Sequence, residues 1–261
     1  MGRPQKERYR DMRKNLIKTM VLGAMIALVA VGVAVAANQP VKVKAGNLEL
    51  TFNGGFSPKV LSKTKLTPIT LQVSGDVKTL DGTHPPALKE FNVETDKNGA
   101  INVKGLPVCT ASKLQSQDTK HAEAICKTAI IGSGQATAEI AFPEQAPIPA
   151  KSKIIAFNGG FKGGVTTLYI HAYLTVPTPA AIVTTVKVKK IHNGRYGLEA
   201  QASIPKIAGG SGSVTHFNLT INKKGVLTAK CPDGKLQAHG TAVFTDGTRA
   251  SAEVTRPCTG K

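Results

Sequence analysis

The sequence predicts an all-β protein: two tandem β-sandwich units that arose by internal duplication, with one short helix in the first unit. Hydrophobic and polar residues alternate with a period of two over much of the chain, which is the pattern of half-buried strands. Sequence motifs also recur in the same order in the two halves. Hydrophobic residues make up 41% of the 261 residues, which excludes a disordered chain.

The first 37 residues are predicted to be a secretory signal peptide. Residues 1–18 carry seven basic and two acidic side chains, and Met20 to Ala37 contains no polar side chain. The segment ends in Ala34-Val35-Ala36, which a signal peptidase accepts, so cleavage is expected near Ala36. The alternative is an uncleaved membrane anchor formed by Met20 to Ala37. Without this segment, the net charge falls from +18 to +13.

Three repeated motifs support the duplication. Phe52–Phe56 recurs as Phe157–Phe161, Phe91–Gly99 as Phe217–Gly225, and Cys109–Gln115 as Cys231–Gln237. They place the units at residues 38–146 and 150–261, joined by a stiff linker at Pro143–Pro149 that is rich in proline. A single larger sandwich, or a closed sheet with internal pseudo-symmetry, is the alternative.

Strands and turns follow from local patterns. Alternation predicts strands at residues 48–52, 69–74, 167–176, 216–221 and 235–245. Hairpin turns are predicted at Lys97-Asn98-Gly99, Lys224-Gly225 and Asp246-Gly247.

One helix is expected, from about Thr110 to Lys127. Leu114, Ala122 and Ile125 are placed to face the core, and no equivalent helix is expected in the second unit.

Four cysteines, an even number in an exported chain, predict two disulfides. Three connectivities are possible. We favour Cys109–Cys126 and Cys231–Cys258, because each pair then lies within one half of the chain.

No motif of a zinc protease, a P-loop or a nucleophile elbow occurs, so no catalytic residue, metal or cofactor is predicted. Ser62-x-x-Lys65 and Ser203-x-x-Lys206 lack the partner motifs of penicillin-binding enzymes. The six histidines show no metal-ligand spacing. A hydrolase whose site is dispersed in the sequence stays a minor hypothesis.

Two surface features are candidates for binding. Tyr169, His171 and Tyr173 share one face of a predicted strand, which suits a glycan or protein ligand, or a half-exposed sheet face with no ligand. Lysines alternate along two other strands: Lys42, Lys44, Lys187 and Lys189, with Lys190 beside them. They either prevent edge-to-edge aggregation or bind anionic wall polymers and lipid head groups.

The leading functional hypothesis is therefore an exported, non-enzymatic envelope protein attached electrostatically to an anionic cell-wall polymer or membrane surface. The alternative is a sandwich module that binds a sugar or protein through Tyr169, His171 and Tyr173. No nucleic-acid partner is expected, because basic and aromatic residues do not interleave.

One resemblance adds to this description. The motifs Gly105-Leu106-Pro107-x-Cys109, Ile131-Gly132-x-Gly134 after Cys126, Cys231-Pro232-Asp233-Gly234 and Asp246-Gly247-Thr248 follow the apolar N-terminal segment. In this order the chain resembles a group of uncharacterised predicted secreted proteins of actinobacteria over most of its mature region. The resemblance implies export and assigns no activity and no site.

Overall fold

The computed structural model describes residues 39–261. The predicted signal peptide, and its alternative as a membrane anchor, lie outside the described residues. Within residues 39–261 the chain is all-β, as the alternating patterns predict, and its main sheet is antiparallel throughout. No helix in this part of the chain has the length and apolarity needed to cross a membrane.

Twelve strands form the main sheet. In spatial order they are β1 (Val41–Ala45), β2 (Leu48–Ser57), β5 (Thr70–Thr79), β13 (Gly212–Ile221), β8 (Ile130–Ile140), β9 (Ile148–Lys162), β10 (Val165–Leu174), β11 (Ala180–Asn193), β12 (Tyr196–Ser203), β6 (Leu88–Asp96), β15 (Lys235–Phe244) and β16 (Arg249–Pro257).

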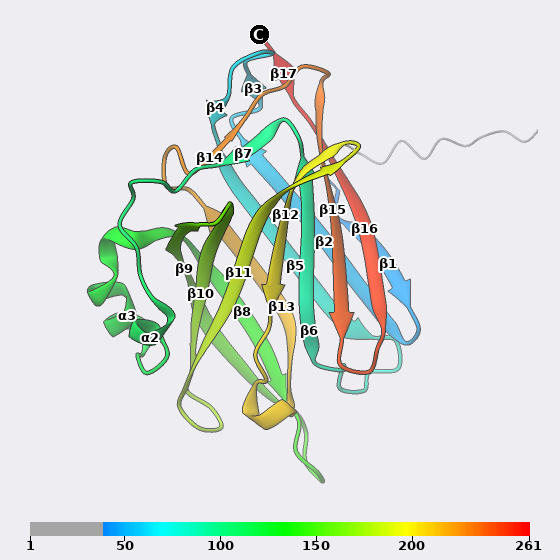
Figure 1. Cartoon of the computed structure of the whole chain (residues 1–261). Helices are drawn as coiled ribbons and strands as arrows, with labels where there is room; N and C mark the ends of the chain where they lie inside the picture. The colour runs from blue at the N-terminus through cyan, green and yellow to red at the C-terminus, as the bar shows by residue number, and fades with distance from the viewer. Residues whose placement is uncertain (1–38) are drawn as a thin grey trace, which may run out of the picture. The chain divides into compact units, whose positions relative to one another are not determined.

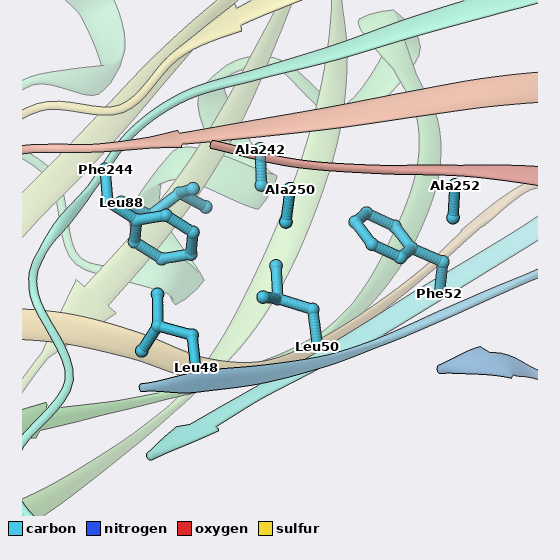
Figure 2. Packing of buried hydrophobic residues seen from close by; sticks show 8 residues of the cluster. All are labelled: Leu48, Leu50, Phe52, Leu88, Ala242, Phe244, Ala250 and Ala252. Carbon is cyan, nitrogen blue, oxygen red and sulfur yellow. The ribbon is translucent and has the colours of Figure 1, made fainter. Parts of the chain in front are cut away.

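The sheet folds back on itself, so its two edge strands, β1 and β16, lie side by side (Figure 1). Side chains of β2 then pack against those of β15 and β16 across a dry core. Figure 2 shows Leu48, Leu50 and Phe52 pointing toward Phe244 and Ala250. A second core forms inside the curve of β8 to β13, around Ala156, Leu168, Val188 and Ile221.

The predicted division into two separate sandwiches is wrong. Strand β13 of the C-terminal half lies between β5 and β8 of the N-terminal half, and β6 lies between β12 and β15. Strands of each half therefore need strands of the other half as hydrogen-bonded neighbours. Residues 39–261 form one larger structure built from both halves, which was the alternative to two sandwiches. Pro143–Pro149 is not an interdomain linker either, because β8 and β9 pair across it and Pro149 lies opposite Glu139.

A small three-stranded sheet lies across one end of the main sheet (Figure 1). Its strands are β4 (Thr67–Pro68), β14 (Leu227–Ala229) and β7 (Gly99–Ile101). The turns at Lys97–Gly99 and Lys224-Gly225 carry the chain from the main sheet into this small sheet, so they do not close hairpins. Asp246-Gly247 does close the predicted hairpin, between β15 and β16. A parallel pair, β3 (Val60–Leu61) and β17 (Thr259–Gly260), lies nearby.

Only one of the repeated motifs has its two copies side by side in the structure. β7 and β14, which follow the two copies of the Phe-Asn motif, pair with each other. The Phe91 and Phe217 rings of those copies lie edge to face, with centroids 5.8 Å apart. The copies of the Phe52 motif are not structurally equivalent, because Phe52 faces the interior whereas Phe157 packs on the outer face beneath the helices. A shift of one residue in strand register produces such a reversal. The copies of the cysteine motif differ as well, because Cys109 precedes α2 whereas Cys231 precedes β15.

The predicted single helix is two short ones, α2 (Ala111–Leu114) and α3 (Thr119–Ile125), followed by the 3-10 turns η1 (Lys127–Ala129) and, elsewhere, η2 (Ala208–Gly210). The break occurs because Asp118 starts a new helix by accepting a hydrogen bond from the His121 amide. Leu114 and Ala122 are buried as predicted, but Ile125 is 49% exposed, which contradicts the prediction.

Both predicted disulfides are confirmed. Cys109–Cys126 closes the helical excursion, and Cys231–Cys258 joins the segment between β14 and β15 to the residue that follows β16. Structural disulfides persist in oxidising compartments, so the pairing is compatible with a location outside the cytoplasm.

Candidate functional site

An apolar pocket lies inside the main sheet, beneath the small sheet. We name this space of about 200 Å³ the inner cavity. Inward-facing side chains of β2, β5, β6, β12, β13, β15 and β16 form its walls, and β7 and β14 close one side. Its apolar lining consists of Phe52, Phe56, Ile69, Leu71, Val73, Phe91, Val93, Leu198, Phe217, Leu227, Leu236, Ala238 and Val254.

Small residues keep the inner cavity open. Gly54 on β2, Ala100 on β7, and Ala238 and Gly240 on β15 line it, where larger side chains would fill it. The neighbours of Val93 in the sheet are also small, Ala200 on one side and Gly240 on the other. The inner cavity therefore results from small side chains at positions that face the interior of the sheet.

An aromatic wall separates the inner cavity from the dry core of Figure 2. The Phe52 and Phe91 rings stack with centroids 6.0 Å apart, and Phe217 meets Phe91 edge to face. Gly75 is required beside them, because a Cβ there would lie 2.7 Å from the Phe217 ring. The wall is rigid, since offset and edge-to-face ring pairs are favourable geometries.

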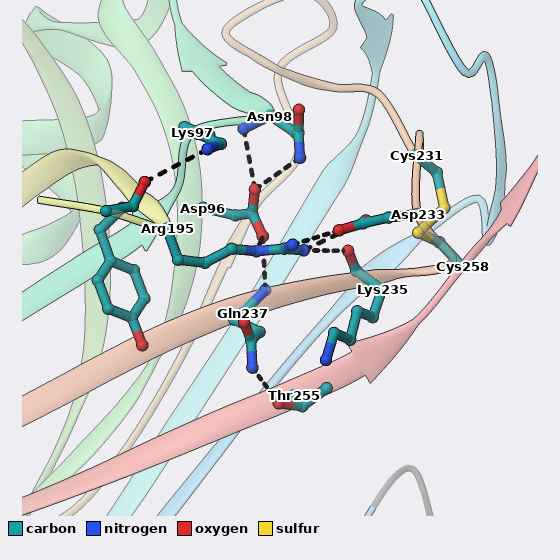
Figure 3. Close-up of polar contacts among 12 residues, drawn as sticks. Asp96, Lys97, Asn98, Arg195, Cys231, Asp233, Lys235, Gln237, Thr255 and Cys258 are labelled. Atoms are coloured by element: carbon teal, nitrogen blue, oxygen red, sulfur yellow. Dashed lines mark hydrogen bonds and ion pairs between the residues drawn. A yellow bond between two sulfur atoms is a disulfide. The ribbon is translucent and has the colours of Figure 1, made fainter. Parts of the chain in front are cut away.

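Asp96 and Gln237 line one end of the inner cavity. They belong to a group of hydrogen-bonded polar residues that we name the Asp96 cluster: Asp96, Asn98, Arg195, Asp233 and Gln237 (Figure 3). Asp96 is 3% exposed. Its carboxylate accepts hydrogen bonds from the backbone N–H of Asn98 at 3.0 Å, the side chain of Asn98 at 2.9 Å, Arg195 Nε at 2.7 Å and the backbone N–H of Gln237 at 3.1 Å.

Arg195 links this cluster to the second disulfide. Its guanidinium also donates to the Asp233 carboxylate and, at 2.8 Å, to the Lys235 carbonyl (Figure 3). The hydrogen bond to Asp233 raises the pKa of Arg195, and the same bond lowers the pKa of Asp233. Asp233 stands between Cys231 and β15, so the ion pairs hold the β11–β12 turn against the disulfide-bonded end of the sheet.

Arg256 closes the sheet at another edge of the inner cavity. Strand β1 begins with Val41 opposite Phe52, so β2 has no β1 neighbour beyond Phe52. The Arg256 side chain reaches from β16 into this gap. It donates to the Gly54 carbonyl, to Asn53 Oδ1 at 2.7 Å, to the Gln39 carbonyl at 3.2 Å and to the Thr255 carbonyl at 2.9 Å. The residue is 6% exposed, and burial lowers the pKa of Arg256.

The predicted ligand face on β10 is not a free surface. His171 is fully buried, and its Nε2 lies 2.9 Å from the Gln117 carbonyl oxygen. Tyr169 packs on the cluster that contains Cys109 and Cys126, and Tyr173 is only partly exposed. The helical excursion covers this face, which sequence alternation within one strand cannot reveal. Burial lowers the pKa of His171.

The five predicted lysines are all exposed. Lys42 and Lys44 lie on β1, the edge strand, where outward lysines suit protection of an edge. Lys187, Lys189 and Lys190 lie on β11, which has neighbours on both sides, so edge protection does not explain them. Lys189 forms an ion pair of 2.7 Å with Glu199.

One serine contacts a histidine. Ser213 Oγ lies 3.1 Å from His84 Nε2, and His84 Nδ1 lies 3.8 Å from a Glu139 carboxylate oxygen. The order of groups matches a hydrolytic triad, but Ser213 is 1% exposed and its hydroxyl is 2.5 Å from the Pro85 carbonyl, to which it donates. In this conformation no substrate reaches the hydroxyl, and the contacts tie the loop before β6 to β13.

Sequence reasoning missed the Asp96 cluster and Arg256. One signal was available, because residues 39–261 contain only Arg195, Arg249 and Arg256 among many lysines. Arginine presents five N–H groups in a rigid fork, so a rare arginine is a candidate for a buried, multiply bonded position. Arg256 is both buried and multiply bonded, whereas Arg195 is multiply bonded but partly exposed.

Comparison with protein-family models and with curated proteins found no match to this chain. Residues 39–261 contain no group of three or more histidine, cysteine or acidic side chains arranged to hold a metal ion.

Proposed function

We propose that this chain is an exported, non-enzymatic binding protein whose inner cavity receives a small apolar ligand. The observation that carries the proposal is the size and lining of the cavity. A void of about 200 Å³ with an almost entirely apolar surface is large for a natural interior, where voids above the size of one water are few.

The energetic argument rests on apolar burial. A ligand that fills the inner cavity removes apolar lining from water, at about 25 cal/mol per Å² of apolar surface. An engineered cavity of about 150 Å³ is known to bind benzene, so a space of about 200 Å³ can take a small apolar molecule.

Export is part of the proposal. The apolar N-terminal segment with its Ala34-Val35-Ala36 site, the two disulfides and the resemblance to secreted proteins of actinobacteria support it.

The test is titration of the purified protein with the apolar fluorophore N-phenyl-1-naphthylamine. We expect saturable binding that Val93→Phe abolishes, because this residue lines the cavity. The matched control is Val243→Phe, the same change on β15 outside the cavity lining, which should leave binding intact. Equal binding by all three proteins, or no saturable binding, contradicts the proposal.

A second candidate function is electrostatic attachment to an anionic wall polymer or membrane surface. The five exposed lysines on β1 and β11 and the net charge of +13 favour it. Sedimentation with anionic vesicles should fall when Lys187, Lys189 and Lys190 are changed to glutamine. It should also fall in 0.5 M salt, where the screening length is roughly 4 Å. Attachment that withstands both changes rules this mechanism out.

A further inference from the structure

A second hollow, of about 500 Å³, lies over the outward-facing residues of β2, β5 and β13. We name it the outer hollow. It exists because Gly55 faces outward without a side chain, and a Cβ there would have no atom within 4 Å. Amide side chains surround the space: Asn53, Gln72 and Asn218.

The charges in the outer hollow are all of one sign. Lys59 and Arg256 line it, and none of its lining residues is acidic. Within residues 39–261, neither cation forms an ion pair with a carboxylate. A charged group that is buried normally has an opposite charge beside it, so Arg256 is an exception.

Hydrogen-bond donors remain on the two cations that line the outer hollow. Arg256 has five N–H groups, and the four hydrogen bonds to protein oxygens leave one on Nη1. The Lys59 ammonium lies 4.0 Å from the centroid of the Phe56 ring and has no hydrogen bond to another described residue. The two cations also repel each other: burial first, and then Arg256, lower the pKa of Lys59.

We propose that the outer hollow binds an oxyanion, a carboxylate or phosphate group, between Lys59 and Arg256. An oxyanion supplies the missing negative charge and accepts the remaining N–H groups, and charge-assisted bonds of this kind are strong. The amide side chains of Gln72 and Asn218 offer further donors around it.

The oxyanion has two possible sources. It is either a free anion or the head of an amphipathic ligand whose apolar part fills the inner cavity. The two spaces adjoin, since both are lined by Gly54, Phe56 and Arg256. The oxyanion site itself does not require that the inner cavity be occupied.

The test is isothermal titration of the purified full chain with inorganic phosphate, with decanoate and with decanol. We expect Lys59→Gln to weaken binding of the anion at least tenfold. Gln72→Glu should do the same, because it places a competing carboxylate in the hollow. The matched control Lys44→Gln removes the same charge from exposed β1 and should change affinity less than twofold. Arg256 is left intact because it closes the sheet.

The titrations distinguish the two sources of the oxyanion and test the site itself. Phosphate binding that depends on Lys59 supports the site with a free anion as its source. Binding of decanoate but not phosphate, with the same dependence, supports the head group of an amphipathic ligand. Binding of neither phosphate nor decanoate to the wild type, or equal loss of anion affinity in Lys59→Gln and Lys44→Gln, overturns the oxyanion site. Failure of decanol or the fluorophore to bind refutes only the cavity proposal.

Discussion

Val93→Phe tests whether the inner cavity is truly empty space. Val93 lines the cavity between Ala200 and Gly240, so a larger side chain has room to extend inward. The change adds four carbon atoms. At about 0.8 kcal/mol for each buried CH₂, the upper limit of the gain is about 3 kcal/mol. After the loss of side-chain freedom, we expect net stabilisation of about 1–2 kcal/mol.

The measurement is urea unfolding followed by far-ultraviolet circular dichroism, because the chain has no tryptophan. The matched control is Val188→Phe, the same substitution at a buried position of the second core that does not line the cavity. Overpacking there should destabilise the protein by about 1–3 kcal/mol. If Val93→Phe destabilises the protein as much as Val188→Phe, the interior is packed and the reasoning fails.

Three further predictions concern the residues that hold the sheet together. The double variant Cys109→Ala, Cys126→Ser should lower the unfolding free energy by about 3 kcal/mol in urea titrations, and an unchanged midpoint would contradict this. Asp96→Asn leaves Arg195 with a weakened partner and should cost about 3 kcal/mol by thermal unfolding, whereas a loss below 0.5 kcal/mol (roughly one surface pair) would show that the cluster is not structural. The buried His171 has a lowered pKa, so folding favours its neutral form and stability should decline as pH falls below the ordinary value of 6.5. His171→Gln should flatten that decline in unfolding titrations at a series of pH values, and an identical pH profile would assign it to other groups.

Features that depend on residues close together in the sequence were predicted correctly. Alternation located β2, β10, β13 and β15, and pairing the cysteines within each half of the chain predicted both disulfides. The helix was found in the correct place, and its break was missed although Asp118 is a good N-cap residue.

What depends on distant residues was not predictable. The two halves look self-contained in sequence because motif order does not reveal strand order, and β13 pairs with β5 from the other half. His171 looked exposed because nothing in its own strand shows that the Gln117 segment will cover it. The inner cavity depends on glycine and alanine positions on β2, β7 and β15, and no local pattern marks them as neighbours.

Arg256 also bears on how the protein folds. It bonds to Gly54 across a separation of 202 residues, and it does so at the point where the curled sheet meets its own edge. Contacts so distant along the chain form late and slowly, because the entropy of a very long loop must be lost first. The walls of the inner cavity therefore assemble only after both edges have been synthesised and brought together. A chain delivered across a membrane in an unfolded state would thus fold on the far side, where its cysteines can also be oxidised.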